Sequence, residues 1–241
     1  MKSDKLEKLQ FDGEDYILYA PDSLNHIAKE MIVAANKKRK EILDFFQIEE
    51  FRKIQINLFD DKDKFRNFIL SLREDKERLP AYAVGTYDRG MINAYVDANI
   101  EKGTFLYNQK TKTISHEMFH IIYMEQVLEN DLSNRVIWLD EGLAQYFSGQ
   151  KDKIKFDDYF FKVLNETKEI PNMNSLRHGT SFYNESYNGY DLSYLCACYL
   201  FEVYDSRKVY EILSNYDLSI EIGSDVLDKM IIYYKNKYEE R

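Results

Sequence analysis

The stretch of sequence that decides the fold of this chain reads HEMFH and covers residues 116–120. It lies within residues 111–128, which contain no Gly or Pro and are apolar on nearly every side, so we expect a buried helix. Residues four apart lie on one face of a helix, so His116 and His120 direct their imidazoles to one place. Burying these groups without partners would be costly, and a metal ion is the simplest partner.

A second stretch, WLDEGLAQYF at residues 138–147, supplies the third ligand of the predicted metal site. It reads as a helix with its acidic residues near the start. Twenty residues separate His120 from Glu141, enough for a turn near Asn130 and Asp131 and an antiparallel return. Catalytic zinc uses three protein ligands and one open position, so His116, His120 and Glu141 predict a single Zn²⁺ site.

Glu117 is adjacent to the first histidine and is predicted to act as the general base rather than as a ligand. The metal lowers the pKa of its bound water toward about 7, and a neighbouring carboxylate can accept the proton. The activated water can then attack a peptide carbonyl, and the same carboxylate can pass its proton to the departing amine.

The pair of motifs resembles the gluzincin branch of zinc metallopeptidases, in particular the peptidase-MA-like domains, which are distant relatives of thermolysin and the zinc aminopeptidases. The resemblance is clearest over residues 113–147. It implies an α+β, zincin-like fold with a strand-bearing N-terminal lobe, a helical C-terminal lobe and an active site between them. It also implies the same three metal ligands and Glu117 as the base.

The chain departs from its relatives at two points. Thermolysin-like enzymes place an Asp four residues after the Glu ligand to orient a histidine, and this chain has Gln145 there. No GAMEN-like stretch, which marks the classical aminopeptidases, precedes HEMFH. An endopeptidase is therefore preferred.

Gly142 is next to the proposed ligand Glu141. It is expected to let its helix approach the metal helix closely.

A donor to the oxyanion is expected beyond the Glu ligand, as in gluzincins. The resemblance favours Tyr190, which leads a predicted helix, with Tyr194 and His178 as alternatives. The spacing of Tyr187, Tyr190 and Tyr194 is equally typical of a packed aromatic face. His178 is expected on an exposed loop.

Substrate binding is expected upstream, where two β-prone runs at residues 83–87 and 91–96 are joined by the hairpin signal Asp88-Arg89-Gly90. The zincin resemblance implies that an edge strand before the metal helix pairs with the peptide backbone. Which of the two runs forms the edge is left open by the sequence.

The remaining pattern predicts a single metallopeptidase domain, residues 1–241, with an α+β lobe at 1–129 and a helical lobe at 130–241. Only 3 Pro and 9 Gly occur, and no linker is visible. The expected elements are a hairpin at 8–19, a strand at 53–59, and helices at 24–46, 62–72, 156–164, 190–204, 209–213 and 224–238.

Composition narrows the partners and the compartment. A net charge of −9 argues against nucleic acid as a partner. The resemblance to metallopeptidases implies a peptide or protein substrate. Cys196 and Cys198 are expected to be buried free thiols, which suit a reducing compartment. The opening residues 1–5 are charged, and no run reaches the length of a membrane span, so a cytoplasmic protein is expected. Export from a trimmed precursor stays an alternative.

Two other interpretations of the motif were weighed. The histidines could merely satisfy hydrogen bonds in a core, or the zinc could belong to a peptide-binding module without catalytic activity. Glu117 beside the metal favours catalysis, since a purely structural site has no use for a base. Structural zinc sites also tend to have four protein ligands, and only three are found here.

Overall fold

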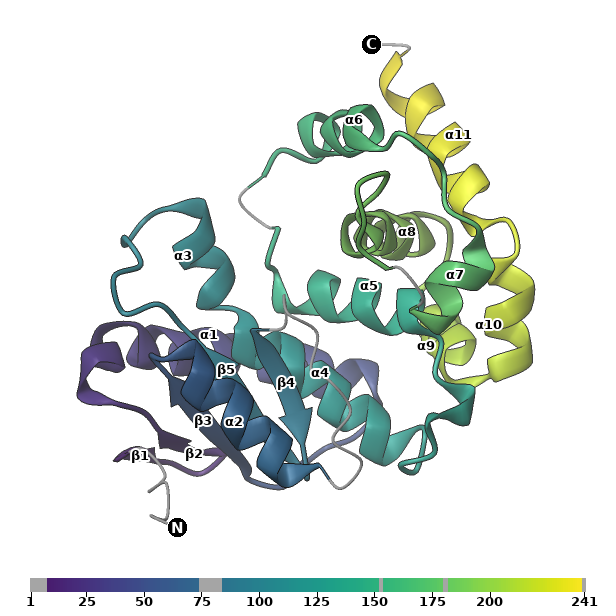
Figure 1. The fold of residues 1–241 in the computed structure, drawn as a ribbon. Coiled ribbons are helices and arrows are strands. Elements are labelled where there is room, and N and C mark those ends of the chain that lie inside the picture. The colour runs from purple at the N-terminus through teal and green to yellow at the C-terminus, as the bar shows by residue number, and fades with distance from the viewer. Residues whose placement is uncertain (1–7, 74–83, 152–153, 180–181, 240–241) are drawn as a thin grey trace. The chain divides into compact units, whose positions relative to one another are not determined.

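The computed structural model of this chain describes residues 8–73, 84–151, 154–179 and 182–239. The chain divides into two compact units, Met1–Ile121 and Ile122–Arg241. The first carries a five-stranded sheet and helices, and the second is helical over its described residues. The predicted α+β class is therefore confirmed (Figure 1).

The sheet of the first unit has the strand order β1-β2-β3-β5-β4. Strands β2, β3 and β5 are parallel, while β1 and β4 run antiparallel to their neighbours. The bounds are β1 Leu9–Asp12, β2 Tyr16–Tyr19, β3 Ile54–Phe59, β4 Gly85–Asp88 and β5 Met91–Tyr95. Among the described strands, β4 forms one edge, which settles the choice that the sequence left open.

The hairpin between β4 and β5 follows the predicted signal. Arg89 and Gly90 both have positive φ, 49° and 72°, as the two central residues of a tight type I′ turn require. The predicted first strand began at Ala83, which lies outside the described residues.

The two faces of the sheet bury different helices, because successive side chains of a strand point to opposite faces. On one face, Phe59 packs with Phe65 and Ile69 of α2 (Lys62–Leu72). On the other, Tyr16 of β2 meets α1 (Asn25–Phe45), whose Arg39 lies 5.7 Å from the centre of its ring. Figure 1 shows α2 on the near side of this sheet.

The bounds of the helices α1 and α2 agree closely with the ranges 24–46 and 62–72 expected from the sequence. Asp61 accepts hydrogen bonds from the backbone N–H groups of Asp63 and Lys64, so α2 begins directly after it, as predicted. A short helix, α3 (Phe105–Lys110), was not predicted. Six residues are too few to show a helical period, although Thr104 caps it.

The second unit contains a series of helices that follow the last part of α4 (Thr113–Gln126). Glu129 and Asn130 have positive φ, 49° and 66°, at the predicted turn. The helices α7 and α10 were not predicted. The elements are η2 Leu132–Asn134, α5 Ile137–Ser148, α6 Phe156–Glu166, α7 Met173–His178, α8 Gly189–Val203, α9 Ser206–Ser214, α10 Tyr216–Gly223 and α11 Val226–Glu239.

Gly142 makes the close packing of α5 against α8 possible. A Cβ atom at this position would lie only 2.3 Å from the backbone oxygen of Ser193 and 3.3 Å from Cβ of Ala197. The prediction that Gly142 lets α5 approach the metal helix closely is therefore wrong, because its nearest neighbours belong to α8.

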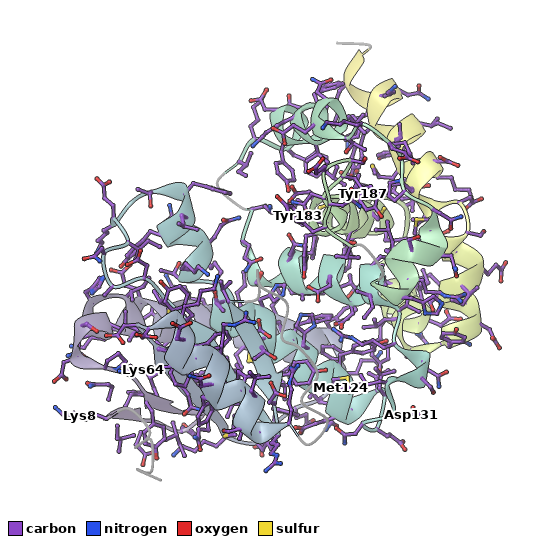
Figure 2. All side chains as sticks on the ribbon, viewed as in Figure 1. Lys8, Lys64, Met124, Asp131, Tyr183 and Tyr187 are labelled. Atoms are coloured by element: carbon purple, nitrogen blue, oxygen red, sulfur yellow. The ribbon has the colours of Figure 1, made fainter. Side chains whose placement is uncertain are left out.

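The side chains of the second unit confirm some of the expectations and correct others. Cys196 and Cys198 of α8 are buried and free, as predicted. His178 is exposed, but it ends α7 instead of lying on a loop. Tyr183 and Tyr187, labelled in Figure 2, precede α8, so Tyr187 does not share a helix face with Tyr190. No helix among the described residues is both long and apolar enough to cross a membrane.

Candidate metal centre

Helix α4 is held in place by the two residues of HEMFH that do not carry the predicted chemistry. Met118 and Phe119 are both fully buried. The hydroxyl of Tyr16 donates to the Met118 sulfur at 3.3 Å, and the Phe119 ring lies 6.0 Å from Phe45 and 4.9 Å from Phe46, centre to centre. These contacts fix the helix rotation, which leaves the two histidines together on another face.

The two imidazoles face each other. Nε2 of His116 and Nε2 of His120 are 3.1 Å apart, and the ring planes are nearly perpendicular at 85°. His120 is only 3% exposed, and the ring of Tyr87 from β4 lies 6.1 Å from it. Two ring nitrogens this close together, one from buried His120 and one from partly buried His116, suit a shared ion.

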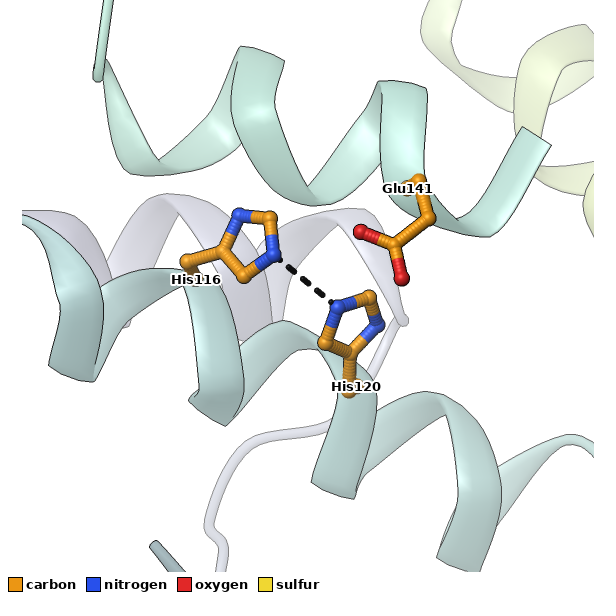
Figure 3. Close-up of side chains that lie close together, drawn as sticks. All are labelled: His116, His120 and Glu141. Carbon is orange, nitrogen blue, oxygen red and sulfur yellow. Dashed lines mark hydrogen bonds between the residues drawn. The ribbon is translucent and has the colours of Figure 1, made fainter. Parts of the chain in front are cut away.

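Glu141 of α5 completes the group. One ligand atom from each of His116, His120 and Glu141 lies within 4.8 Å of the others, and Figure 3 shows the three side chains together. Zinc bonds of about 2.0–2.1 Å in a tetrahedral site put two donors about 3.3 Å apart. The imidazole nitrogens stand near this separation, and a carboxylate oxygen of Glu141 lies within 4.8 Å of both. Two imidazoles and one carboxylate suit zinc, so the donor set fits the predicted ion.

The Glu117 carboxylate is buried next to the start of β4. Glu117 is 7% exposed, and a Cβ atom placed on Gly85 would lie 2.6 Å from Oε1 of Glu117. The missing side chain at Gly85 therefore makes the space that this carboxylate fills. Sequence reasoning missed Gly85, although a Gly inside a β-prone run is a known sign of a close approach.

A partly buried lysine, Lys110, adds positive charge near the same carboxylate. Burial lowers the pKa of Lys110 to about 8, and the charge of Lys62 acts in the same direction. The negative charge of Glu117 acts in the opposite direction and favours the protonated lysine. Lys110 was not singled out from the sequence, because nothing in its neighbours indicates burial.

Comparison with known families identifies the superfamily of this chain. The family model described as the peptidase MA superfamily matches residues 81–231, which is more than half of the chain. The chain belongs to the peptidase MA superfamily. A search among curated proteins finds no match. The matched region contains His116, Glu117, His120 and Glu141. It extends well beyond residues 113–147, where the resemblance is clearest.

This peptidase-superfamily chain has an ion pair beside Glu141 that sequence reasoning missed. Asp140 is fully buried and accepts hydrogen bonds from Arg135, whose guanidinium also approaches Glu141. The signal was present in the sequence, since an Asp next to the predicted ligand in an apolar helix needs a partner.

Gln145 takes a different role from the Asp found in thermolysin-like relatives. Its amide donates to the backbone oxygen of Tyr190 at 2.8 Å and to that of Glu141 at 3.4 Å. Gln145 therefore ties the start of α8 to the helix that carries the carboxylate ligand.

The three candidates for the oxyanion donor have different neighbours. Tyr190 is in the first turn of α8, and its ring packs edge-on against Phe182 at 4.8 Å. Tyr194 packs against Tyr159 at 5.8 Å, and Nε2 of His178 accepts a hydrogen bond from Nε of Arg177 at 3.0 Å. Tyr190 stays the predicted donor on the strength of the resemblance.

Proposed function

We propose that this member of the peptidase MA superfamily is a zinc-dependent endopeptidase. The observation that carries the proposal is the grouping of His116, His120 and Glu141, with Glu117 on the same helix as the two histidines. A base next to a three-donor group is what hydrolysis requires and what a closed structural site does not.

The residues divide the work as follows. An ion held by the three donors would act as a Lewis acid that makes bound water more acidic and polarises the carbonyl of the scissile bond. Glu117 accepts a proton from the attacking water and delivers it to the amine of the leaving product. Its burial beside Gly85 limits its motion, so little entropy is lost when the reactants align.

The edge strand β4 is the proposed platform for the substrate. Among the described strands it pairs with β5 alone, so its other edge offers backbone donors and acceptors to an extended peptide. Gly85 stands at the end of β4 nearest to Glu117, so a paired peptide would pass beside the base. Binding through the backbone predicts modest dependence on substrate side chains.

A cytoplasmic location is part of the proposal. It is supported by the two buried thiols, Cys196 and Cys198, which suit a reducing compartment.

The proposal is tested with a diverse peptide library, incubated with the wild-type protein with and without a chelator. We expect internal cleavage that the chelator abolishes and added zinc restores. Glu117→Gln should keep the metal and lose hydrolysis by roughly 10²–10⁴-fold, because only proton transfer is removed.

Glu125→Gln makes the same chemical change on the same helix and should cleave like the wild type. Full activity in Glu117→Gln would contradict the assigned base. A wild-type protein that binds zinc and retains peptides without cleaving them would instead support the peptide-binding module.

A further inference from the structure

Arg135 and Asp140 form a tightly bonded ion pair at the start of α5. Nε and one terminal nitrogen of Arg135 lie 2.6 Å and 2.5 Å from Oδ2 of Asp140. The Asp140 side chain is 0% exposed and that of Arg135 is 19% exposed. A buried carboxylate is tolerated only with such bonds, so each member of the pair requires the other.

The same guanidinium faces the proposed metal ligand. Its terminal nitrogen lies 3.7 Å from Oε1 of Glu141, a distance at which opposite charges attract but which exceeds a hydrogen bond. Arg135 thus stands between two neighbouring carboxylates and makes its short contacts with Asp140.

We propose that the Arg135–Asp140 pair is a positioning device for Glu141, in which Asp140 retains the guanidinium so that the Glu141 carboxylate stays available to the metal. This inference rests on metal ligation by Glu141, as in the proposed function. The pair attracts one Glu141 oxygen and fixes its direction. Asp140 balances the positive charge, so the ion does not meet an uncompensated cation.

A purely structural role is the competing explanation. Arg135 precedes α5, and its bond to Asp140 also anchors the chain where it enters this helix. Loss of that anchor would lower stability and would leave zinc affinity largely untouched. Zinc affinity and stability must therefore be measured separately on the same variants.

The test is a zinc titration of the full chain against a competing chelator, with thermal unfolding of the metal-free protein alongside. Asp140→Asn should weaken zinc binding by about 10–100-fold, as is usual when a partner of a metal ligand is removed. The freed guanidinium would then bond to Glu141 and compete with zinc. The double variant Arg135→Gln, Asp140→Asn removes both charges and should recover most of the lost affinity.

Arg73→Gln is the matched control, since Nε of Arg73 donates to Asp88 at 3.0 Å in a partly buried pair of the same chemistry. Its zinc affinity should equal that of the wild type. The inference is overturned if Asp140→Asn binds zinc like the wild type, if the double variant is as weak as Asp140→Asn, or if Arg73→Gln weakens zinc equally.

The outcomes separate this inference from the proposed function. A wild-type protein that binds zinc but cleaves no peptide contradicts the proposed activity and leaves the role of Asp140 intact. A wild-type protein that cleaves peptides, with an Asp140→Asn variant of unchanged zinc affinity, does the reverse.

Discussion

Gly85→Ala is expected to reduce catalysis strongly while hardly changing stability. The new Cβ atom would lie 2.6 Å from Oε1 of Glu117, and ordinary contact begins near 3.4 Å, so the carboxylate must retreat by about 0.8 Å. The tip of a glutamate yields easily. A displacement near 1 Å at a catalytic group costs about 10²-fold in rate, which is the loss in kcat/KM that we expect.

The stability of Gly85→Ala should stay within about 1 kcal/mol of the wild type. Gly85 does not have a positive φ, so alanine fits the backbone and restricts the unfolded chain. The tight contact with Thr113, 3.2 Å from its Cγ2, offsets part of that gain. Zinc content should be unchanged, because no ligand moves.

The assay compares kcat/KM on a cleaved peptide, zinc content after dialysis, and thermal unfolding. Gly223→Ala is the control, because its new Cβ atom meets Trp138 at 3.3 Å and no residue of the proposed site. Wild-type turnover in Gly85→Ala would refute the reasoning that β4 confines the base. A loss of several kcal/mol in stability would refute the reasoning that the carboxylate is the part that yields.

Two further predictions concern a buried charge and the oxyanion. The pKa of Lys110 is lowered from 10.5 to about 8, chiefly by burial, so between these pH values the unfolded chain holds a proton that the folded chain has released. Lys110 should therefore contribute a stability that rises with pH across this window, so Lys110→Met should be on the order of 3 kcal/mol more stable than the wild type at pH 7 and should lose most of that advantage as the pH approaches 10.5. Chemical denaturation from pH 7 to 10.5 checks this, and identical pH slopes in the two proteins would contradict it. Tyr190→Phe should lower kcat by about 10²-fold or more with KM nearly constant, since its hydroxyl is needed mainly in the transition state. Because the packing on Phe182 is kept, normal turnover in steady-state kinetics would mean that Tyr190 only packs.

The parts of the fold that local sequence determines were predictable. A long stretch without Gly or Pro identified α4, and the helical pattern of residues 62–72 identified both ends of α2. The ligand group followed from helical spacing for His116 and His120 and from a motif resemblance for Glu141. Each of these signals lies within one continuous stretch of the chain.

The parts that depend on distant partners were not predictable. Whether β4 or β5 forms the edge depends on pairing with β3, which is separated from the hairpin by α2. Gly142 was recognised as a point of close approach, but α8 follows too far along the chain to be named as the neighbour. Gly85 carried a sign of a close approach and Asp140 a sign of a charged partner, but the sequence alone names neither Glu117 nor Arg135 as that neighbour.

The packing of Met118 and Phe119 has a consequence for protein engineering. These are the two positions that the HExxH pattern leaves unspecified. Here the Met118 sulfur accepts a hydrogen bond from the Tyr16 hydroxyl, and the Phe119 ring packs beside Phe45 and Phe46. Replacing residues 116–120 by the HExxH pentapeptide of another zinc enzyme would keep the two histidines and the glutamate but would lose the packing of Met118 and Phe119. A library randomised at these two positions should return almost exclusively bulky apolar pairs.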